Sequence, residues 1–255
     1  MPVRKRFGQH FLHDPAVIER IVNALDPQPG QRLVEIGPGR GALTRRVLER
    51  SGSLDVIEID RDLAALTREQ FAAEHSLRVH EGDALKFDFA ALGSGLRVFG
   101  NLPYNISTPL LFHLIGSAGA ITDMLFMLQR EVVRRITASP GSKTYGRLTV
   151  MLAAAASAEH LFDVGSGAFN PPPKVDSAIV RLVPHARPPF AIDDHTLFAR
   201  LVREAFSHRR KTLRNALGGL ATAADIEAAG IDPQARPETV SPAGFASISA
   251  QAGRH

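Results

Sequence analysis

The residues best suited to chemistry form one short segment, Asn101-Leu102-Pro103-Tyr104, after an apolar run at 96–99 that predicts a buried strand. The Asn101 amide oxygen and the Leu102 carbonyl are acceptors that could hold the hydrogens of an amino group. A planar amine on a conjugated ring is a poor nucleophile, because its lone pair is delocalised into the ring. Such bonds favour a pyramidal nitrogen, whose lone pair can react. Pro103 stiffens the backbone, and the Tyr104 ring offers a face for stacking a base. The segment predicts a loop that presents a planar amine for reaction, although a turn with a buried tyrosine would have the same letters.

A second candidate site is the glycine-rich run Glu35-Ile36-Gly37-Pro38-Gly39-Arg40-Gly41, between a predicted strand at 32–36 and a predicted helix at 43–49. Glycine lets the backbone turn sharply and approach a ligand closely. Gly37, Gly39 and Ala42 also satisfy the dinucleotide fingerprint, and Glu58 lies at the distance of a ribose-binding acid. The glycine loop alone therefore leaves a dehydrogenase and a methyltransferase open.

Three further features favour S-adenosylmethionine as the ligand. Gly41 completes the spacing G-x-G-x-G, with Glu35 two residues before the first glycine. A predicted third strand ends in Gly82-Asp83-Ala84, where an acceptor could meet the adenine amine of the cofactor. The fourth strand ends in the segment 101–104, which a hydride-transfer enzyme does not need. All these points fall at carboxyl ends of strands, where open α/β sheets bind ligands.

The order of predicted elements indicates an α/β fold with two domains. Strands and helices alternate along the first part of the chain, which predicts a Rossmann-like parallel sheet covered on both faces. We assign 1–185 to this S-adenosylmethionine-binding catalytic domain, with a final strand at 175–183. We assign 186–255 to a small helical RNA-binding domain, with helices predicted at 194–207, 209–217, 223–229 and 242–250.

Composition narrows the class of protein. The 255 residues include no cysteine, which excludes disulfides, Cys-ligated zinc and a thiolate nucleophile. The start of the chain lacks the apolar segment of a signal peptide and no long apolar run follows, so we expect a cytoplasmic protein. The net charge is only +4, but basic residues gather near both ends and predict contacts with RNA phosphates. These residues are Arg4, Lys5 and Arg6, and then Arg209, Arg210, Lys211 and Arg214.

Taken in order along nearly the whole chain, these motifs resemble those of the ribosomal RNA adenine dimethyltransferases, in particular the bacterial small-subunit branch. Further marks are Gly8-Gln9-His10-Phe11-Leu12, the run from Phe169 to Ser177, and the run from Phe206 to Asn215. The resemblance implies dimethylation of two adjacent adenosines near the 3′ end of small-subunit (16S) rRNA, during subunit maturation. It places S-adenosylmethionine against His10, Leu12, Gly37, Glu58, Asp83 and Asn101. Many members carry Asn where this chain has His10.

Two of these predictions have structural alternatives. Phe169, held by three prolines, could sandwich a flipped adenine with Tyr104, or it could anchor its loop in the core. On a helix, Arg210 and Arg214 would share a face, which could contact phosphate or simply be solvated.

Other functions also remain open. The nearest is a resistance-type adenine N6-methyltransferase of large-subunit rRNA, which shares the catalytic motifs. A protein-glutamine methyltransferase uses an Asn-Pro-Pro-Tyr loop, which Leu102 and the basic ends fit poorly. A non-catalytic assembly factor would not need an intact set of Glu58, Asp83 and Asn101. For the enzyme we expect a monomer that works without a metal, since the sulfonium of the methyl donor needs no metal activation.

Overall fold

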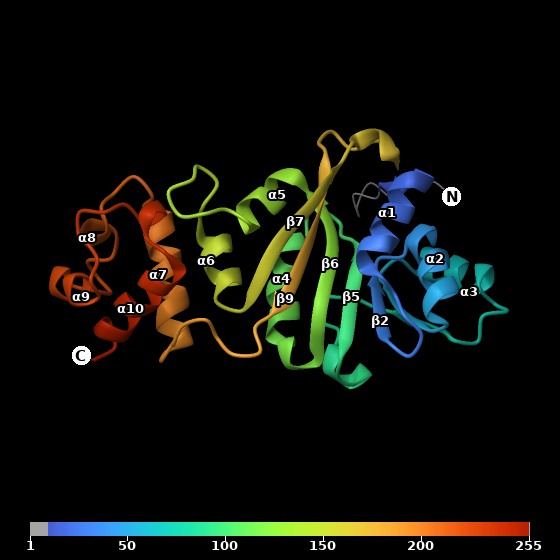
Figure 1. Cartoon of the computed structure of the whole chain (residues 1–255), viewed down its shortest axis with the longest axis horizontal. Coiled ribbons are helices and arrows are strands. Elements are labelled where there is room, and N and C mark those ends of the chain that lie inside the picture. Colours follow the sequence, from blue (N-terminus) through green and yellow to red (C-terminus); the bar gives the residue numbers. More distant parts are fainter. Residues whose placement is uncertain (1–9, 255) are drawn as a thin grey trace. The chain divides into compact units, whose positions relative to one another are not determined.

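The computed structural model describes residues 10–254, so Arg4, Lys5 and Arg6 lie outside the described residues. The chain divides into two compact units (Figure 1). The first holds the chain up to Val133 together with Glu159–Pro184, and the second holds Arg134–Ala158 and the chain from His185 onward. The chain therefore passes into the second unit twice, whereas the sequence predicted one passage after residue 185.

A seven-stranded sheet with the order β4-β3-β2-β5-β6-β9-β7 forms the centre of the fold (Figure 1). Its strands are β2 (Arg32–Ile36), β3 (Leu54–Glu58), β4 (Leu77–Glu81), β5 (Leu96–Asn101), β6 (Ile121–Gln129), β7 (Ala156–Val164) and β9 (Ser177–Pro184). The pairs β2–β3, β2–β5, β3–β4 and β5–β6 are parallel. The centres of β2, β3 and β5 are fully buried, as Val34, Val56 and Val98 show, because helical connections cover parallel strands.

The sheet is mixed, which corrects the prediction of a parallel sheet. β9 runs antiparallel to β6, with Met127 opposite Ile179. The residues between β7 and β9, all of them described, form a short 3₁₀ turn and the strand β8 (Phe169–Asn170) but no α-helix. A parallel neighbour needs a long crossover, usually a helix. β9 is reached from β7 by a loop without an α-helix, so β9 runs in the direction opposite to the helix-connected strands.

The helices that connect the strands of the first part of the chain are α1 (Pro15–Leu25), α2 (Ala42–Ser51), α3 (Arg61–Gln70), α4 (Ser107–Gly116) and α5 (Arg130–Ile136). Asp14 caps α1 by accepting from the backbone of Ala16 and Val17, and Pro15 occupies the first turn. An Asp followed by a Pro is a sequence signal for a helix start, and α1 begins there. α2 packs against β3, and α3 packs against β3 and β4, which fixes the loops at their carboxyl ends.

The second unit is helical, with α6 (Arg147–Ala153), α7 (His195–Ser207), α8 (Leu213–Ala216), α9 (Ala223–Ala228) and α10 (Pro242–Ala252). Its core gathers Tyr145 and Val150 with Phe198, Leu213 and Phe245. The segment at 141–145 has the polar composition of an exposed loop, but Tyr145 is fully buried and its hydroxyl donates to the Val240 carbonyl at 2.7 Å. This buried ring explains why residues 134–158 belong to the helical unit.

The helix predicted at 209–217 is shorter, since only Leu213–Ala216 is helical. The Lys211 N–H donates to the His208 carbonyl and closes a separate turn. The backbone N–H groups of Leu213 and Arg214 donate to Ala235 and Pro233 instead of to an earlier helical turn. Arg210 and Arg214 therefore do not share one helix face, and that prediction was wrong.

Candidate active site

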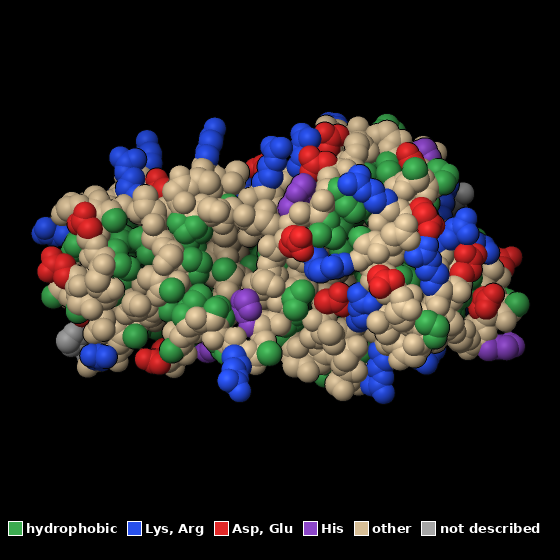
Figure 2. Space-filling model, viewed as in Figure 1, with side chains coloured by type: hydrophobic (Ala, Val, Ile, Leu, Met, Phe, Trp, Pro, Cys, Tyr) green, Lys and Arg blue, Asp and Glu red, His purple; other side chains and the backbone are tan. Residues whose placement is uncertain are grey.

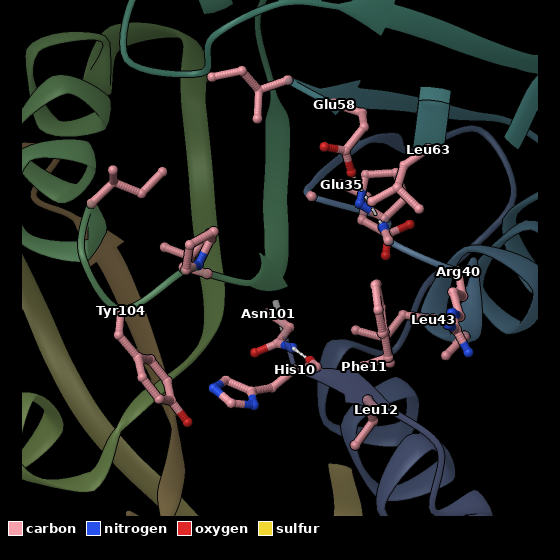
Figure 3. Close-up of a pocket in the computed structure, with 18 of the residues that line it drawn as sticks. His10, Phe11, Leu12, Glu35, Arg40, Leu43, Glu58, Leu63, Asn101 and Tyr104 are labelled. Carbon is pink, nitrogen blue, oxygen red and sulfur yellow. Dashed lines mark hydrogen bonds between the residues drawn. The ribbon is translucent and has the colours of Figure 1, made fainter. Parts of the chain in front are cut away.

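A cavity of about 270 Å³ lies at the carboxyl ends of β2, β3 and β5. It brings together both candidate sites found in the sequence (Figure 3). The predicted site residues among its lining are His10, Leu12, Gly37, Glu58, Asp83, Asn101, Leu102 and Tyr104. Glu35 and Glu58 lie on one side of this cavity and Tyr104 on the other (Figure 3).

The glycine loop turns directly after β2 and lines the cavity. Gly37 has φ 69° and donates its N–H to the Ile57 carbonyl at 2.9 Å, which ties the loop to β3. Gly41 has φ 79°, and a Cβ there would lie 3.0 Å from the Phe71 ring. Both positions therefore need glycine, and the loop backbone stays close to the cavity.

Glu58 ends β3 with its carboxylate held in place by backbone donors. Asp60 N–H donates to Oε1 at 2.9 Å, and Gly39 N–H approaches Oε2 at 3.4 Å. Burial raises the pKa of Glu58, and these backbone bonds oppose the rise. The carboxylate is thus a fixed acceptor beside the glycine loop, suited to hydroxyl groups of a ligand.

Asp83 lies in the turn after β4 and also lines the cavity. Its Oδ1 accepts from the Leu85 N–H at 3.0 Å, so the side chain caps a turn as well. A carboxylate has a second oxygen, and a turn cap that lines a cavity can still accept from a ligand amine.

Asn101 ends β5, and Leu102 begins the candidate substrate loop. The Asn101 Nδ2 donates to the His10 carbonyl at 3.1 Å, and its Oδ1 points away from that carbonyl, on the side of Tyr104 (Figure 3). Leu102 is buried and its N–H donates to the Met127 carbonyl at 3.2 Å. The loop therefore presents an amide oxygen at a place that two neighbouring segments fix.

Tyr104 is half-buried, and its hydroxyl lies 2.9 Å from Ser177 Oγ at the start of β9. Burial raises the pKa of Tyr104. The ring is thus held at its outer end as well as by the backbone, which favours a fixed stacking surface. In the sequence, Ser177 stood out only as the end of a longer motif, and nothing local indicated this contact.

Gly100 directly precedes Asn101 and is a site residue that sequence reasoning missed. A Cβ on Gly100 would lie 2.3 Å from the Ile36 carbonyl oxygen. β2 and β5 therefore approach closely where the glycine loop and Asn101 both begin. The signal in the sequence was a glycine inside an apolar strand, which marks a close backbone approach.

Glu35 is a second such residue, since the sequence indicated it only as part of the glycine-rich motif. It is 2% exposed, lines the cavity, and accepts from Thr44 Oγ1 at 2.6 Å. Burial raises the pKa of Glu35 to about 8; the Thr44 bond opposes this and the Glu58 charge adds to it. The Glu35 carboxyl is consequently neutral over much of the physiological range, next to a second buried acid.

We expect Glu35→Gln to make the protein more stable at neutral and higher pH. A carboxyl pKa raised from 4.5 to about 8 gives stability that is present below 4.5 and lost as the pH rises toward 8. Gln can still accept the Thr44 bond and does not ionise. In denaturant unfolding, the free energy of unfolding of the variant relative to the parent should rise with pH across that window, by at most about 1.4 kcal/mol per pH unit. Glu69→Gln, an exposed acid, serves as control; a gap between Glu35→Gln and parent that does not change with pH would refute the assignment.

Phe169 does not lie where the stacking prediction needs it. The side chain is 2% exposed and belongs to the core cluster of the first unit, with Leu12 as its strand partner. It is not part of the cavity lining. The apolar ring anchors its loop in the core, which was the alternative interpretation, so the prediction of a sandwich with Tyr104 needs correction.

The basic residues near the carboxyl end differ in their surroundings. Arg210, Lys211 and Arg214 are exposed, and Lys and Arg side chains project from the surface of this unit (Figure 2). Arg209 has partners within its own unit: its Nη2 donates to the Lys143 carbonyl at 2.8 Å, and its Nε lies 3.9 Å from Glu238. The first three are available to a partner, whereas Arg209 connects parts of its own unit.

Two general features of the described part of the chain complete the site. Within residues 10–254, no group of three or more His, Asp or Glu side chains is arranged to hold a metal ion. The helices in the same range include none that is both long and apolar enough to cross a bilayer.

The sheet order and the cavity define a Rossmann-like methyltransferase. The chain is similar to the crystal structure of a dimethyladenosine transferase from Plasmodium falciparum, with a TM-score of 0.78, 26% identity, and coverage of 94% of this chain and 96% of that one. It is also similar to the 23S rRNA methyltransferase ErmE, with a TM-score of 0.76, 27% identity, and coverage of 95% and 99%.

The family follows from the sequence comparison. The model of the family described as ribosomal RNA adenine dimethylase matches residues 2–252, and the chain belongs to that family. A relative named ribosomal RNA small subunit methyltransferase A, from Pseudomonas fluorescens, is 57% identical over 251 residues, which are 97% of this chain and 93% of the relative. The protein is thus an rRNA methyltransferase whose methyl donor is S-adenosylmethionine.

Proposed function

We propose that this protein dimethylates N6 of two adjacent adenosines near the 3′ end of 16S rRNA, during maturation of the small ribosomal subunit. What carries the proposal is the joining of the glycine loop and the Asn101–Tyr104 segment in one cavity. A cofactor site and a base-binding loop at the same strand ends place donor and acceptor next to each other. The name of the relative that is 57% identical supports the choice of the small subunit.

The residues present fit S-adenosylmethionine, which supplies an electrophilic methyl group on a sulfonium. Glu58 would accept from the ribose hydroxyls, because its carboxylate is already fixed by two backbone donors. Asp83 would accept from the adenine amine of the cofactor. His10, Leu12 and Gly37 would contribute the close backbone surface that the family resemblance implies. Glu35 adds a buried carboxyl to the same lining.

The target adenine would enter from the side of Tyr104. The Asn101 Oδ1 and the Leu102 carbonyl would accept the amino hydrogens and direct the nitrogen lone pair toward the methyl group. Tyr104 would stack on the base and hold its plane. When bound, S-adenosylmethionine would supply the methyl group to N6 and leave as its neutral thioether, and the proton that N6 gives up would pass to solvent. The chain needs no covalent step of its own for this displacement.

RNA binding would use the exposed cations of the second unit, together with Arg4, Lys5 and Arg6, which were also predicted to contact RNA phosphates. We expect the combined replacement of Arg210, Lys211 and Arg214 by Ala to weaken RNA binding. The slope of log Kobs against log salt should become shallower by about 0.7 to 0.9 for each phosphate that the variant no longer neutralises. Replacing Arg200 and Arg203 of α7 by Ala is the control, because it removes exposed positive charge outside the cluster and should leave the salt slope close to that of the parent. Filter binding across a salt series measures this slope. Equal slopes in the parent and the triple variant would show that these residues are solvated and do not contact RNA phosphates.

Large-subunit rRNA is the competing substrate, since ErmE shares 27% identity and nearly the whole fold. Labelled S-adenosylmethionine should be incubated with purified protein and either immature small subunits or protein-free large-subunit rRNA. We expect label on the small subunit at least about tenfold above that on the large-subunit RNA, a margin of about 1.4 kcal/mol. The reverse preference would establish the resistance-type activity instead, and label on neither RNA would favour an assembly factor. We further propose that the enzyme acts as a monomer. We also propose that it acts in the cytoplasm, where its rRNA substrate would mature.

A further inference from the structure

The contacts of His10 place it between the substrate loop and the segment that precedes β9. Its carbonyl accepts from Asn101 Nδ2 at 3.1 Å, and its ring Nδ1 lies 2.8 Å from the Pro171 carbonyl. A carbonyl only accepts, so Nδ1 must carry the hydrogen. The centroids of the His10 and Tyr104 rings are 5.9 Å apart. His10 thus contacts both ends of the substrate loop and the segment that follows β8.

The strand register explains why the His10 carbonyl is available. β1 (Phe11–Leu12) pairs antiparallel with β8, with Phe11 opposite Asn170. His13 N–H donates to the Ala168 carbonyl, and hydrogen-bonded positions alternate along an antiparallel pair. His10 therefore falls opposite Pro171 at a non-hydrogen-bonded position. There its backbone carbonyl points away from β8, and it meets Asn101 instead.

This contact determines the orientation of the Asn101 amide. A flip of the side-chain amide would exchange Nδ2 and Oδ1 and place Oδ1 next to the His10 carbonyl. Both oxygens are acceptors, so no hydrogen bond could form between them. With Nδ2 on His10, the acceptor Oδ1 faces the side of Tyr104 (Figure 3). That is the side from which the target amine would approach.

We propose that His10 is a positioning residue for methyl transfer, which holds the Asn101 amide oxygen toward the adenine amine. The His10 ring, bonded to Pro171, keeps the His10 carbonyl in place, and the carbonyl keeps Asn101 from turning over. The inference rests on the proposed function, because it explains how the amide of that function is aimed. It adds a role that the expected cofactor contact of His10 does not include.

The test compares single-turnover methylation of immature small subunits at saturating S-adenosylmethionine. His10→Phe keeps a flat ring and loses the Nδ1 hydrogen, and it should lower the rate by about tenfold, within the coupling known for contacting residues. His10→Asn restores a side-chain donor and should recover most of the rate. His13→Phe removes an exposed histidine from the same segment and serves as the matched control. A parental rate in His10→Phe would overturn the proposal.

A double variant separates positioning from cofactor or base contact. In an Asn101→Ala background the amide is gone, so His10→Phe should cost less than about a further twofold. Losses that multiply would show that His10 acts on the cofactor or the base and would overturn the proposal. Asn101→Asp keeps an acceptor oxygen and removes the donor to His10. It should lose as much rate as Asn101→Ala, within about threefold, and a near-parental rate would also contradict us.

A readout without RNA distinguishes failure of this inference from failure of the proposed function. In ¹⁵N spectra with bound S-adenosylmethionine, the side-chain amide signal of Asn101 should move in His10→Phe and stay in His13→Phe. An unmoved signal overturns the inference even if the parent methylates rRNA. If the parent methylates neither RNA, the proposed function fails, while a moved signal still supports the His10 contact. Should His10→Phe not fold, the Asn101→Asp rate decides the matter.

Discussion

Asn101→Ala should lower the single-turnover methylation rate by about 10²–10³, the usual loss for one preorganised polar group in the transition state. The amide oxygen accepts an amino hydrogen as the nitrogen becomes pyramidal, so this bond is strongest when the methyl group is transferred. The acceptor is already oriented, because Nδ2 is bonded to the His10 carbonyl. The side chain is therefore ordered on folding and not during the reaction.

Saturating S-adenosylmethionine removes any contribution from weaker cofactor binding in this variant. Asn23→Ala, on the exposed side of α1, provides a matched control with the same chemical change. Thermal unfolding of both variants shows whether the fold is kept. An Asn101→Ala enzyme with the parental single-turnover rate would contradict the role of the amide, whatever happened to its KM.

Glu58→Ala should weaken S-adenosylmethionine binding by about 10- to 150-fold, which corresponds to a charge-assisted hydrogen bond of about 1.5–3 kcal/mol. Two effects act in the same direction. The variant loses the acceptor for the ribose hydroxyls, and it leaves the N–H groups of Gly39 and Asp60 without their partner. The loop that carries Gly39 then loses part of its fixed shape.

Calorimetric titration of the apo protein measures this loss directly. Glu58→Gln separates the two effects, because one amide oxygen can satisfy only part of the donor set and carries no charge. The affinity of Glu58→Gln for S-adenosylmethionine should lie between that of the parent and that of Glu58→Ala. Glu69→Ala, an exposed acid on α3, should bind as the parent does. Unchanged affinity in Glu58→Ala would show that the ribose is held elsewhere.

The sequence was sufficient to predict the site wherever a motif stood at the end of a strand. The carboxyl ends of β2, β3 and β5 meet at one edge, so Gly37, Glu58 and Asn101 had to converge once the parallel pairing was assumed. Local backbone chemistry is also sufficient at Asp14 and Pro15, where a capping acceptor followed by a first-turn proline begins α1. Periodicity and motif order carry this kind of information well.

Tertiary contacts account for what the sequence did not reveal. Tyr145 lies in a polar stretch, and only its burial against the helical core shows that residues 134–158 belong to the second unit. Arg209 looks like its neighbours in a basic run, but a bond to the Lys143 carbonyl distinguishes it. Phe169 could have been a stacking surface or a core residue, and its burial decides for the core. The role proposed for His10 depends on strand register, which no local pattern encodes.

The chemical identity of the product tests the central claim most directly. Small-subunit rRNA should be isolated after reaction of immature subunits with the purified protein, digested, and analysed by mass spectrometry of its oligonucleotides and nucleosides. We predict N6,N6-dimethyladenosine at two neighbouring positions near the 3′ end, and its absence after reaction with the Asn101→Ala variant over the same time. Methyl groups on a ring nitrogen, on ribose or on a pyrimidine would contradict this mechanism, as would dimethyladenosine confined to large-subunit rRNA.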